Sequence, residues 1–168
     1  MFRVFNEPLP VDRYLGCWAK HMGRFSQVAG YTSFGDLFLI DPTSGQYAVL
    51  CPLTGERFPT SCHDAETFRN GLLADPEIID RFARPDDVAE LCERVGALGD
   101  EEVYIPCPYP FLGGSGELTT YQKGRLWEFL HLVGQMRGLG EPGEVQVTVQ
   151  STHKALQRPG GPVDGTPS

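Results

Sequence analysis

Apolar residues recur at helical spacing in two places along the chain, near its start and near residue 130. Such spacing places the apolar side chains on one face of a helix, where they pack on a core. The first stripe predicts a helix from about 11 to 24 that opens the fold, and the second predicts a long helix over 123–137. The stripes consist of Val11, Leu15, Trp18, Met22 and Phe25, and of Leu126, Phe129, Leu130, Val133 and Met136.

Strand-like segments lie between these two stripes. Residues 36–41 and 46–51 flank the turn-forming sequence Pro-Thr-Ser-Gly, which predicts a β-hairpin. Within it, Leu37–Ile40 is apolar at every position, so this strand should lie centrally with cover on both faces. Residues 102–106 predict another strand, and residues 144–150 predict an edge strand.

Three helix starts follow one another in the middle of the chain. Asp64, Asp75 before Pro76, and Pro85 each place carboxylates or proline where the first turn of a helix favours them. They predict helices at about 64–74, 76–83 and 85–97. In the last helix the buried stripe is Val88, Leu91, Cys92 and Val95, whereas Asp86, Asp87, Glu90 and Glu93 point away from it.

Together these elements predict an α+β fold with a mostly antiparallel sheet of about four or five strands and helices packed on it. We expect residues 1–150 to form a single domain, because a chain of 168 residues is long enough for one sizeable core. Residues 151–168 should form a flexible tail, and their proline and glycine content predicts disorder.

The net charge of −8 lies entirely in residues 61–102, which hold twelve acids and four arginines. With no cluster of Lys or Arg elsewhere, direct binding to nucleic acid is not expected. Six of the twelve acids stand at helix starts and have a local structural reason. The remaining field repels nucleic acid and attracts basic surfaces, so this segment is either a solvated face or a docking face for a basic partner.

No apolar run approaches the roughly 20 residues of a membrane span, and the first residues do not resemble a signal peptide. We therefore expect a cytoplasmic protein that contacts no membrane. Five cysteines, at spacings typical of neither zinc nor redox sites, are expected to be reduced and mostly buried.

The sequence Gly113-Gly-Ser-Gly116 lies between a strand and a helix, where glycine loops bind phosphate. However, Lys123 comes too late for a P-loop, and Thr119 stands where a dinucleotide fingerprint needs a small residue. A structural turn is the better interpretation, and we predict no cofactor.

The histidines give little support to catalysis. His21 and His131 follow tryptophans by about one helical turn and are expected to pack against aromatic rings. Cys62 and His63 are adjacent in a helix cap, whereas a working pair usually comes from distant positions. Asp36 and Asp41 bracket a strand and should point to opposite faces, so we predict no metal site and no catalytic residue.

A resemblance adds to this picture. Residues 30–39, 49–56, 68–75, 103–114 and 123–136 follow one another in an order and spacing that resembles bacterial proteins related to the C-terminal domain of a type VI secretion immunity protein, which neutralises a DNase effector. The likeness covers about two thirds of the chain. It implies a bacterial cytosolic protein, belonging with uncharacterised relatives, that blocks a toxic effector without chemistry of its own.

We therefore predict a non-enzymatic immunity protein that binds a cognate effector with a basic surface, as toxin and antitoxin do. Asp86, Asp87, Glu90 and Glu93 are the predicted contacts, since they share a polar face. Two alternatives stay open: an enzyme that binds a small molecule or nucleotide at Gly113–Gly116, and a general protein-interaction scaffold. The oligomeric state is not predicted.

Overall fold

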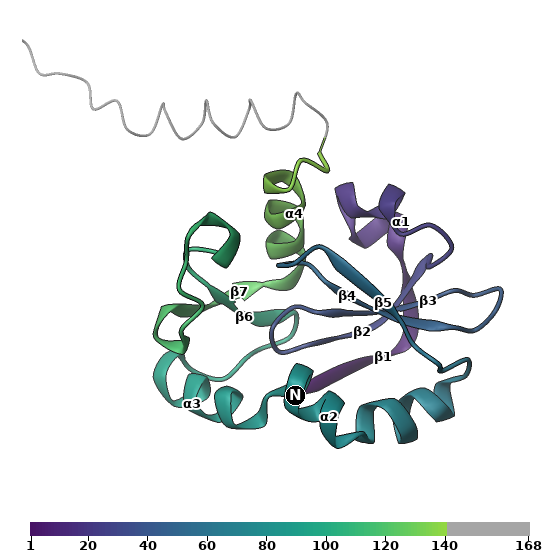
Figure 1. Ribbon diagram of the computed structural model, residues 1–168, viewed down its shortest axis with the longest axis horizontal. Coiled ribbons are helices and arrows are strands. Elements are labelled where there is room, and N and C mark those ends of the chain that lie inside the picture. Colours follow the sequence, from purple (N-terminus) through teal and green to yellow (C-terminus); the bar gives the residue numbers. More distant parts are fainter. Residues whose placement is uncertain (141–168) are drawn as a thin grey trace, which may run out of the picture.

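The computed structural model describes residues 1–140, which form a five-stranded antiparallel sheet with helices on both faces and a separate two-stranded sheet (Figure 1). The α+β prediction is therefore confirmed. Neighbouring strands of the large sheet follow chain order. They are β1 (Phe2–Pro10), β2 (Gln27–Thr32), β3 (Leu37–Ile40), β4 (Tyr47–Cys51) and β5 (Glu56–Pro59), and the small sheet pairs β6 (Glu102–Pro106) with β7 (Tyr121–Arg125).

The helical segments are short except for two of eleven residues each, α3 and α4. Several single turns have 3₁₀ or π geometry, labelled η. In chain order the helical segments are α1 (Val11–Tyr14), η1 (Gly16–His21), η2 (Thr67–Gly71), η3 (Leu72–Ala74), α2 (Pro76–Ile78), η4 (Ile79–Ala83), α3 (Pro85–Val95), η5 (Pro110–Leu112), η6 (Leu118–Thr120) and α4 (Leu126–Met136).

The predicted hairpin is confirmed, with Leu37 opposite Leu50 and Ile40 opposite Tyr47. Strand β3 is the middle strand of the sheet, and all four of its residues are buried. Leu37 and Leu39 belong to one core cluster, whereas Phe38 and Ile40 belong to another. The sheet is thus covered on both faces, as the apolar run predicts.

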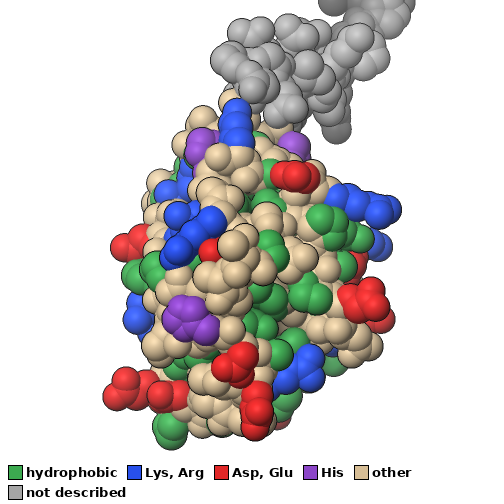
Figure 2. All heavy atoms as spheres, turned by 90° about the vertical axis from the view of Figure 1, so that its right-hand side faces the viewer, with side chains coloured by type: hydrophobic (Ala, Val, Ile, Leu, Met, Phe, Trp, Pro, Cys, Tyr) green, Lys and Arg blue, Asp and Glu red, His purple; other side chains and the backbone are tan. Residues whose placement is uncertain are grey.

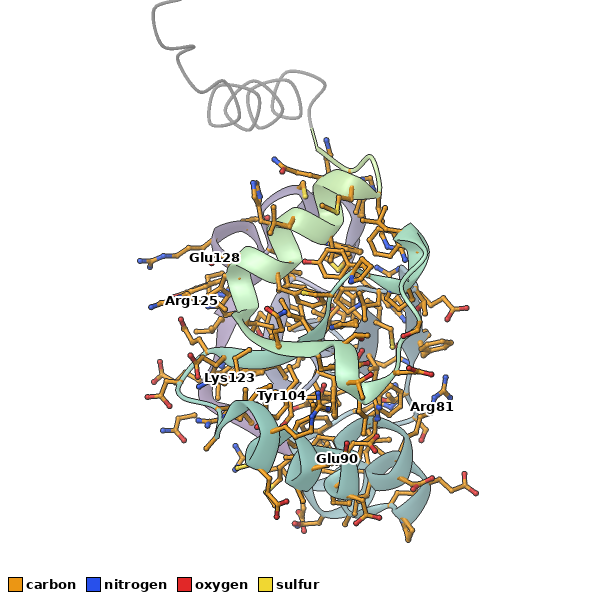
Figure 3. All side chains as sticks on the ribbon, turned by 90° about the vertical axis from the view of Figure 1, so that its left-hand side faces the viewer. Arg81, Glu90, Tyr104, Lys123, Arg125 and Glu128 are labelled. Atoms are coloured by element: carbon orange, nitrogen blue, oxygen red, sulfur yellow. The ribbon has the colours of Figure 1, made fainter. Side chains whose placement is uncertain are left out.

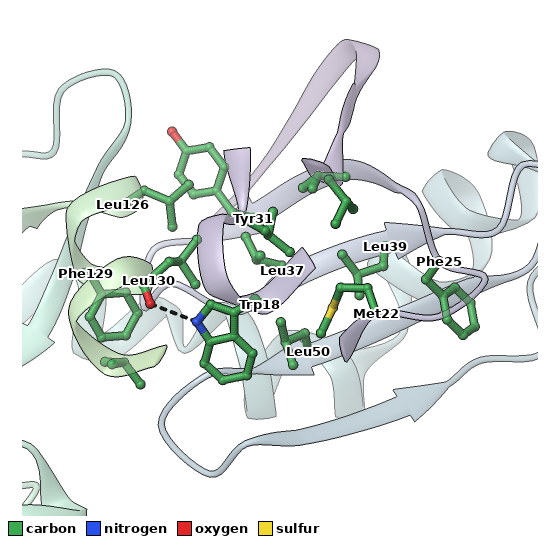
Figure 4. Packing of buried hydrophobic residues seen from close by; sticks show 14 of the residues in the cluster. Trp18, Met22, Phe25, Tyr31, Leu37, Leu39, Leu50, Leu126, Phe129 and Leu130 are labelled. Carbon is green, nitrogen blue, oxygen red and sulfur yellow. Dashed lines mark hydrogen bonds between the residues drawn. The ribbon is translucent and has the colours of Figure 1, made fainter. Parts of the chain in front are cut away.

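One core lies between the sheet and the helical segments α1, η1 and α4 (Figure 4). Trp18 contributes a buried hydrogen bond to this core: its indole Nε1–H donates to the carbonyl oxygen of Leu130 at 2.8 Å. This bond joins the start of the chain to α4 and satisfies a polar group that burial would otherwise leave unpaired. The stripe from Val11 to Phe25 is buried, as predicted.

The opposite face of the sheet is covered by the helical segments that follow β5. Phe68 stacks on Tyr47 with ring centroids 4.2 Å apart and meets Phe38 edge-on at 5.2 Å. Phe82 from η4 completes this second core. Aromatic pairs of this kind favour one relative orientation of helix and sheet.

A third cluster joins α3 to the small sheet. Leu91 of α3 is fully buried together with Tyr104 of β6, Phe34 and Tyr121. The Tyr104 hydroxyl donates to the carbonyl oxygen of Gly96 at 2.9 Å, just beyond the end of α3. The two sheets are linked at Ser33, whose carbonyl oxygen accepts from the Tyr104 amide at 2.7 Å.

Three predicted helices in the middle of the chain are confirmed as helical segments, although π and 3₁₀ turns interrupt them and α3 ends at Val95. Strand 102–106 is confirmed as β6. The buried stripe of α3 is correct for Leu91 but wrong for Cys92, which is exposed because its side of the helix faces a surface hollow. The prediction that the cysteines are mostly buried is wrong: all five are free thiols, but only Cys62 is buried, Cys17 and Cys51 are half-buried, and Cys107 is exposed like Cys92.

The prediction of one helix over 11–24 is wrong. Strand β1 opens the fold, and α1 gives way to η1 at Gly16, whose φ of +53° lies in the left-handed region and breaks the helical ladder. The start of the helix predicted at 123–137 is also wrong, because residues 121–125 pair with β6 before α4 begins. Met136 is 52% exposed, so it does not belong to the core stripe.

Strands β1 and β2 were not predicted. Residues 144–150 and 151–168, for which a strand and a flexible tail are predicted, lie outside the described residues. In the part of the chain that the structure describes, no helix is long and apolar enough to cross a membrane.

The approach of α4 to η1 generates a test of the first core. A Cβ atom at Gly134 would lie 2.7 Å from Trp18 Nε1 and closer still to Cys17 Sγ. We expect Gly134→Ala to lower the free energy of unfolding by about 1–3 kcal/mol, because α4 must move away from η1. Urea unfolding followed by tryptophan fluorescence measures this.

Gly71→Ala is the matched control, since its Cβ would meet only the Thr67 methyl group at an ordinary 3.7 Å. A Gly134→Ala variant as stable as the wild type would contradict the packing of Trp18 against α4.

Candidate functional site

The acidic segment lies on one side of the molecule, where η2, α2, η4 and α3 follow each other across the lower face of the sheet (Figure 1). In the face drawn in Figure 2, acidic side chains gather mainly at the lower end, where the helices after β5 lie. Some of these carboxylates accept hydrogen bonds from backbone amides at helix starts. Asp64 accepts from the Thr67 amide at 2.7 Å, and Asp75 accepts from the Glu77 amide at 2.8 Å, as the predicted helix caps require.

Hydrogen bonds from the Thr67 amide and hydroxyl lower the pKa of Asp64 from its ordinary value, so this acid stays ionised. Near the end of the segment Glu102 accepts from the Gly99 amide at 2.7 Å, and its pKa is lowered for the same reason. Lys123 lies 3.6 Å from Glu102, and Arg3 lies 3.0 Å from Asp100. These acids therefore have structural partners inside the chain.

Helix α3 begins in an unusual way. Arg84, the residue before Pro85, has φ +45° and ψ +61°, a left-handed conformation that is costly for a side chain other than glycine. Its guanidinium carbon lies 4.2 Å from the centre of the Phe34 ring, and its Nε donates to Asp87 Oδ2 at 2.7 Å. The side chain thus holds the start of α3 against the turn between β2 and β3.

The four predicted contact residues have different environments. Asp87 is half-buried and paired with Arg84, so the prediction that it points away with the others is wrong: its pair with Arg84 holds it near the Phe34 ring. Asp86, Glu90 and Glu93 are exposed and lie on one face of α3. Glu90 stands 3.7 Å from Arg94, whereas Asp86 and Glu93 have no ion pair with any residue in 1–140.

Arg94 does not neutralise this face fully, because its guanidinium is also used elsewhere. It donates to the carbonyl oxygens of Leu118 and Thr119 at 2.7 and 3.1 Å, tying α3 to η6. Figure 3 shows Glu90 on α3 below the small sheet. The exposed residues Asp86, Glu90 and Glu93, which we call the α3 acidic face, therefore present unsatisfied negative charge to solvent.

Asp36, Thr32 and Cys51 form a polar cluster near Arg84, where the β2–β3 turn meets β4. Asp36 accepts from the Thr32 hydroxyl at 3.2 Å and hydrogen-bonds the Cys51 thiol. Burial raises the pKa of Asp36, and burial together with the neighbouring Asp36 raises the pKa of Cys51 to about 12. A thiol with such a pKa stays protonated at neutral pH and is not a nucleophile.

The glycine-rich sequence at 113–116 forms a closed turn. The amides of Leu112 and Gly114 both donate to the carbonyl oxygen of Tyr109, at 2.9 and 3.1 Å. A Cβ at Gly114 would collide with the Pro108 carbonyl, and Gly113 has φ +88°, so both glycines are needed by the turn itself. Because these amides point inward, and a 3₁₀ turn of three residues follows instead of a helix, the geometry favours a structural turn over a phosphate site.

The three histidines within residues 1–140 belong to separate segments, η1, the loop after β5 and α4. His63 is exposed and its Nδ1 lies 3.0 Å from the Ser61 carbonyl oxygen, whereas its neighbour Cys62 is buried. His21 and His131 are exposed, although Trp18 beside His21 is buried and Trp127 beside His131 is half-buried. Across residues 1–140, no group of three or more His, Cys, Asp or Glu side chains is placed to hold a metal ion.

Asp41 is a turn residue. It accepts from the Thr43 amide at 2.9 Å and from the Ser44 hydroxyl at 2.7 Å, which closes the β3–β4 turn. The sequence alone did not point to Arg84. Its only local signal is the Arg-Pro step before a helix, and the Phe34 ring on which it stacks lies far away in the chain.

No protein-family model matches the sequence, and no curated protein matches it. The fold is similar to the crystal structure of Atu4351 from Agrobacterium tumefaciens, with a TM-score of 0.57 and 14% sequence identity. The similarity covers 80% of this chain and 66% of the Agrobacterium chain. At this identity the likeness is one of fold alone.

The left-handed conformation of Arg84 generates a test. Arg84→Ala removes the stacking and the ion pair but keeps the strained backbone, whereas Arg84→Gly removes all three. We expect both variants to be less stable than the wild type, and the glycine variant to be more stable than the alanine variant by about 1 kcal/mol. Urea unfolding measures the difference. An alanine variant at least as stable as the glycine variant would show that the backbone is unstrained.

The half-buried Asp36 generates a pH test. Because its pKa is higher in the folded than in the unfolded chain, the wild type loses stability as pH rises through the range in which only the unfolded chain ionises. Asp36→Asn does not ionise, so its stability relative to the wild type should increase from about pH 4 to pH 7. Urea unfolding at the two pH values checks this, with the exposed Asp86→Asn as the control. A difference that does not change with pH would contradict the assignment.

Proposed function

We propose that the protein is a cytoplasmic immunity protein, which binds a cognate secreted effector toxin and blocks it without chemistry of its own. The observation that carries the proposal is the α3 acidic face, formed by Asp86, Glu90 and Glu93 on the segment that holds the whole net charge. The resemblance of residues 30–137 to type VI secretion immunity proteins supports it and names the class of partner.

A nuclease effector fits the charge of this face. An enzyme that cleaves DNA carries a basic cleft for phosphate groups, and an acidic surface competes for that cleft electrostatically. Complementary charge accelerates encounter, whereas the affinity of most interfaces comes from a few buried apolar or aromatic contacts. In this proposal Asp86 and Glu93 contact the effector directly, and Glu90 does so beside Arg94.

Asp87 has a different role from the other three acids. Its carboxylate lies 2.7 Å from Arg84 Nε, and that guanidinium stacks on Phe34. Asp87 is therefore a positioning residue that orients the start of α3, and its replacement should act through the orientation of that helix.

Two features favour binding over the alternative of a small enzyme. The Gly113 and Gly114 amides donate to the carbonyl oxygens of Pro110 and Tyr109, and the Cys51 thiol is protonated at neutral pH. A general protein-interaction scaffold is the remaining alternative. A toxin or secretion-associated reading frame beside this gene favours immunity, and its absence favours the scaffold.

Co-expression with the toxin encoded beside the gene tests the proposal. We expect the wild-type protein to restore growth and to inhibit the purified toxin. Asp86→Lys with Glu93→Lys should weaken inhibition by about tenfold or more, and the remaining affinity should depend less on salt, because the charges that steer encounter have been reversed.

Glu128→Lys is the control charge reversal, since Glu128 lies on α4 in the upper part of the view in Figure 3, whereas Glu90 lies toward its lower end. It should leave inhibition unchanged. Inhibition and salt dependence that survive reversal of Asp86 and Glu93 would exclude this face, and a wild-type protein that protects against no adjacent toxin would contradict the immunity function itself.

A further inference from the structure

Two neighbouring hollows lie between α3 and the beginning of β1. Their volumes are about 270 and 350 Å³, and both are lined by Met1, Phe2 and Val88. Together we call them the α3 groove, with the smaller hollow as its first part and the larger as its second. The first part extends toward the helical segments η3 and η4, and the second extends along α3 toward Cys92 and Leu98.

The first part of the α3 groove is apolar throughout. Besides the shared residues it is lined by Leu73, Ile79, Ala83 and Pro85, all of which have hydrocarbon side chains. Phe2, Leu73, Ile79 and Val88 are half-buried, so each leaves apolar surface in contact with water. Removing such surface from water is favourable by about 25 cal/mol per Å².

Acidic residues lie beside one end of this groove, although no Asp or Glu lines its two parts. A neighbouring hollow that shares Pro85 is lined by Asp80 and Asp86, neither of which forms an ion pair with a residue in 1–140. Farther along α3, Glu93 directly follows Cys92, which lines the second part of the groove. The α3 acidic face and the α3 groove thus lie on adjoining sides of one helix.

Arginines near the groove make contacts within the chain. Arg84 is paired with Asp87 and stacked on Phe34. The Arg81 guanidinium carbon lies 5.3 Å from the centre of the Phe58 ring and 5.1 Å from that of Phe82. Arg3, beside the second part, is 3.0 Å from Asp100.

The Met1 ammonium, on a residue that lines both parts of the groove, donates to the Ser33 hydroxyl at 2.6 Å. Of the nearby arginines, Arg3 and Arg84 have carboxylate partners, whereas the ring contacts of Arg81 leave its charge in place. A basic ligand therefore meets unpaired carboxylates only at Asp80 and Asp86, beside Arg81, and at Glu93.

From this combination we infer that the α3 groove binds a protein segment that carries one or two large apolar side chains between lysines or arginines. The apolar side chains enter the hollow beside Phe2 and Val88, and the basic groups reach Asp86 and Glu93. A second copy of this chain is disfavoured by its own charge of −8, and nucleic acid has no apolar side chain to insert. The inference deepens the proposed function and rests on it only for the identity of the partner.

The test uses a defined probe and the full chain. We would titrate the ¹⁵N-labelled protein with a peptide of about twelve residues that alternates leucine pairs with lysines, and record amide chemical shifts. The largest shifts are expected at Phe2, Leu73, Ile79, Val88 and Cys92. A peptide with serines in place of the leucines, and one with glutamates in place of the lysines, should bind at least about tenfold more weakly.

Substitutions in the groove test which side chains contribute to the affinity for the peptide. Leu73→Ser with Val88→Ser should weaken the leucine–lysine peptide by about tenfold or more. The matched control is Leu132→Ser, at a side chain that is 38% exposed on α4 across the sheet, and it should leave affinity unchanged. Because the shifts are mapped on the wild-type protein, the outcome does not depend on how well a variant folds.

Shifts that map away from the α3 groove, or equal binding of the serine or glutamate peptide, would overturn the inference. So would peptide-free self-association through the groove in sedimentation. The peptide titration contains no toxin, so the two tests are independent. A peptide that does not bind would not change the result of the protection test, and a protein that gives no protection could still bind the peptide. If protection holds, Leu73→Ser with Val88→Ser should weaken it while Leu132→Ser does not.

Discussion

Four consecutive apolar residues form the middle strand of the sheet, and the burial of both faces of that strand organises the rest of the structure. Leu37 and Leu39 have essentially no exposed surface on one side, and Phe38 has none on the other. A strand of this kind is stable only if each face of the sheet is covered by another layer. The helical segments of the first and last parts of the chain cover one face, and the segments after β5 cover the other.

The position of the candidate site follows from the second of these layers. Phe68 and Phe82 pack the segments after β5 beneath the sheet, and Arg84 then turns the chain sharply into α3 against Phe34. Because Leu91 is drawn into the cluster with Tyr104 and Tyr121, the opposite side of α3 faces solvent with its carboxylates. The groove beside them arises where this helix passes the free edge of β1.

Charge in this protein has two separate uses. Arginines serve the fold: Arg57 donates to the carbonyl oxygens of His21 and Met22, and Arg137 donates to those of Pro52 and Leu53. In these roles the guanidinium satisfies backbone acceptors near aromatic rings, with Arg57 over Phe25 and Arg137 over Phe111. Several acids are used at helix starts in the same structural way, so a count of charged residues overstates what is available to a partner. Asp86 and Glu93 on α3 are among the acids that have no ion pair with a residue in 1–140.

The sequence by itself determined the features that depend on neighbouring residues: the β3–β4 hairpin, the helix starts at Asp64 and Asp75, strand β6 and the acidic segment. Caps and turns close hydrogen bonds within a few residues, so their signals are local. Only the tertiary structure decided the pairing of β1 with β2, the break at Gly16, the left-handed Arg84 and the meeting of Phe2 with Val88. Each of these features depends on contacts with a segment that is distant in the chain, or on backbone strain that such contacts stabilise. A local pattern of residues does not show which distant segment that is.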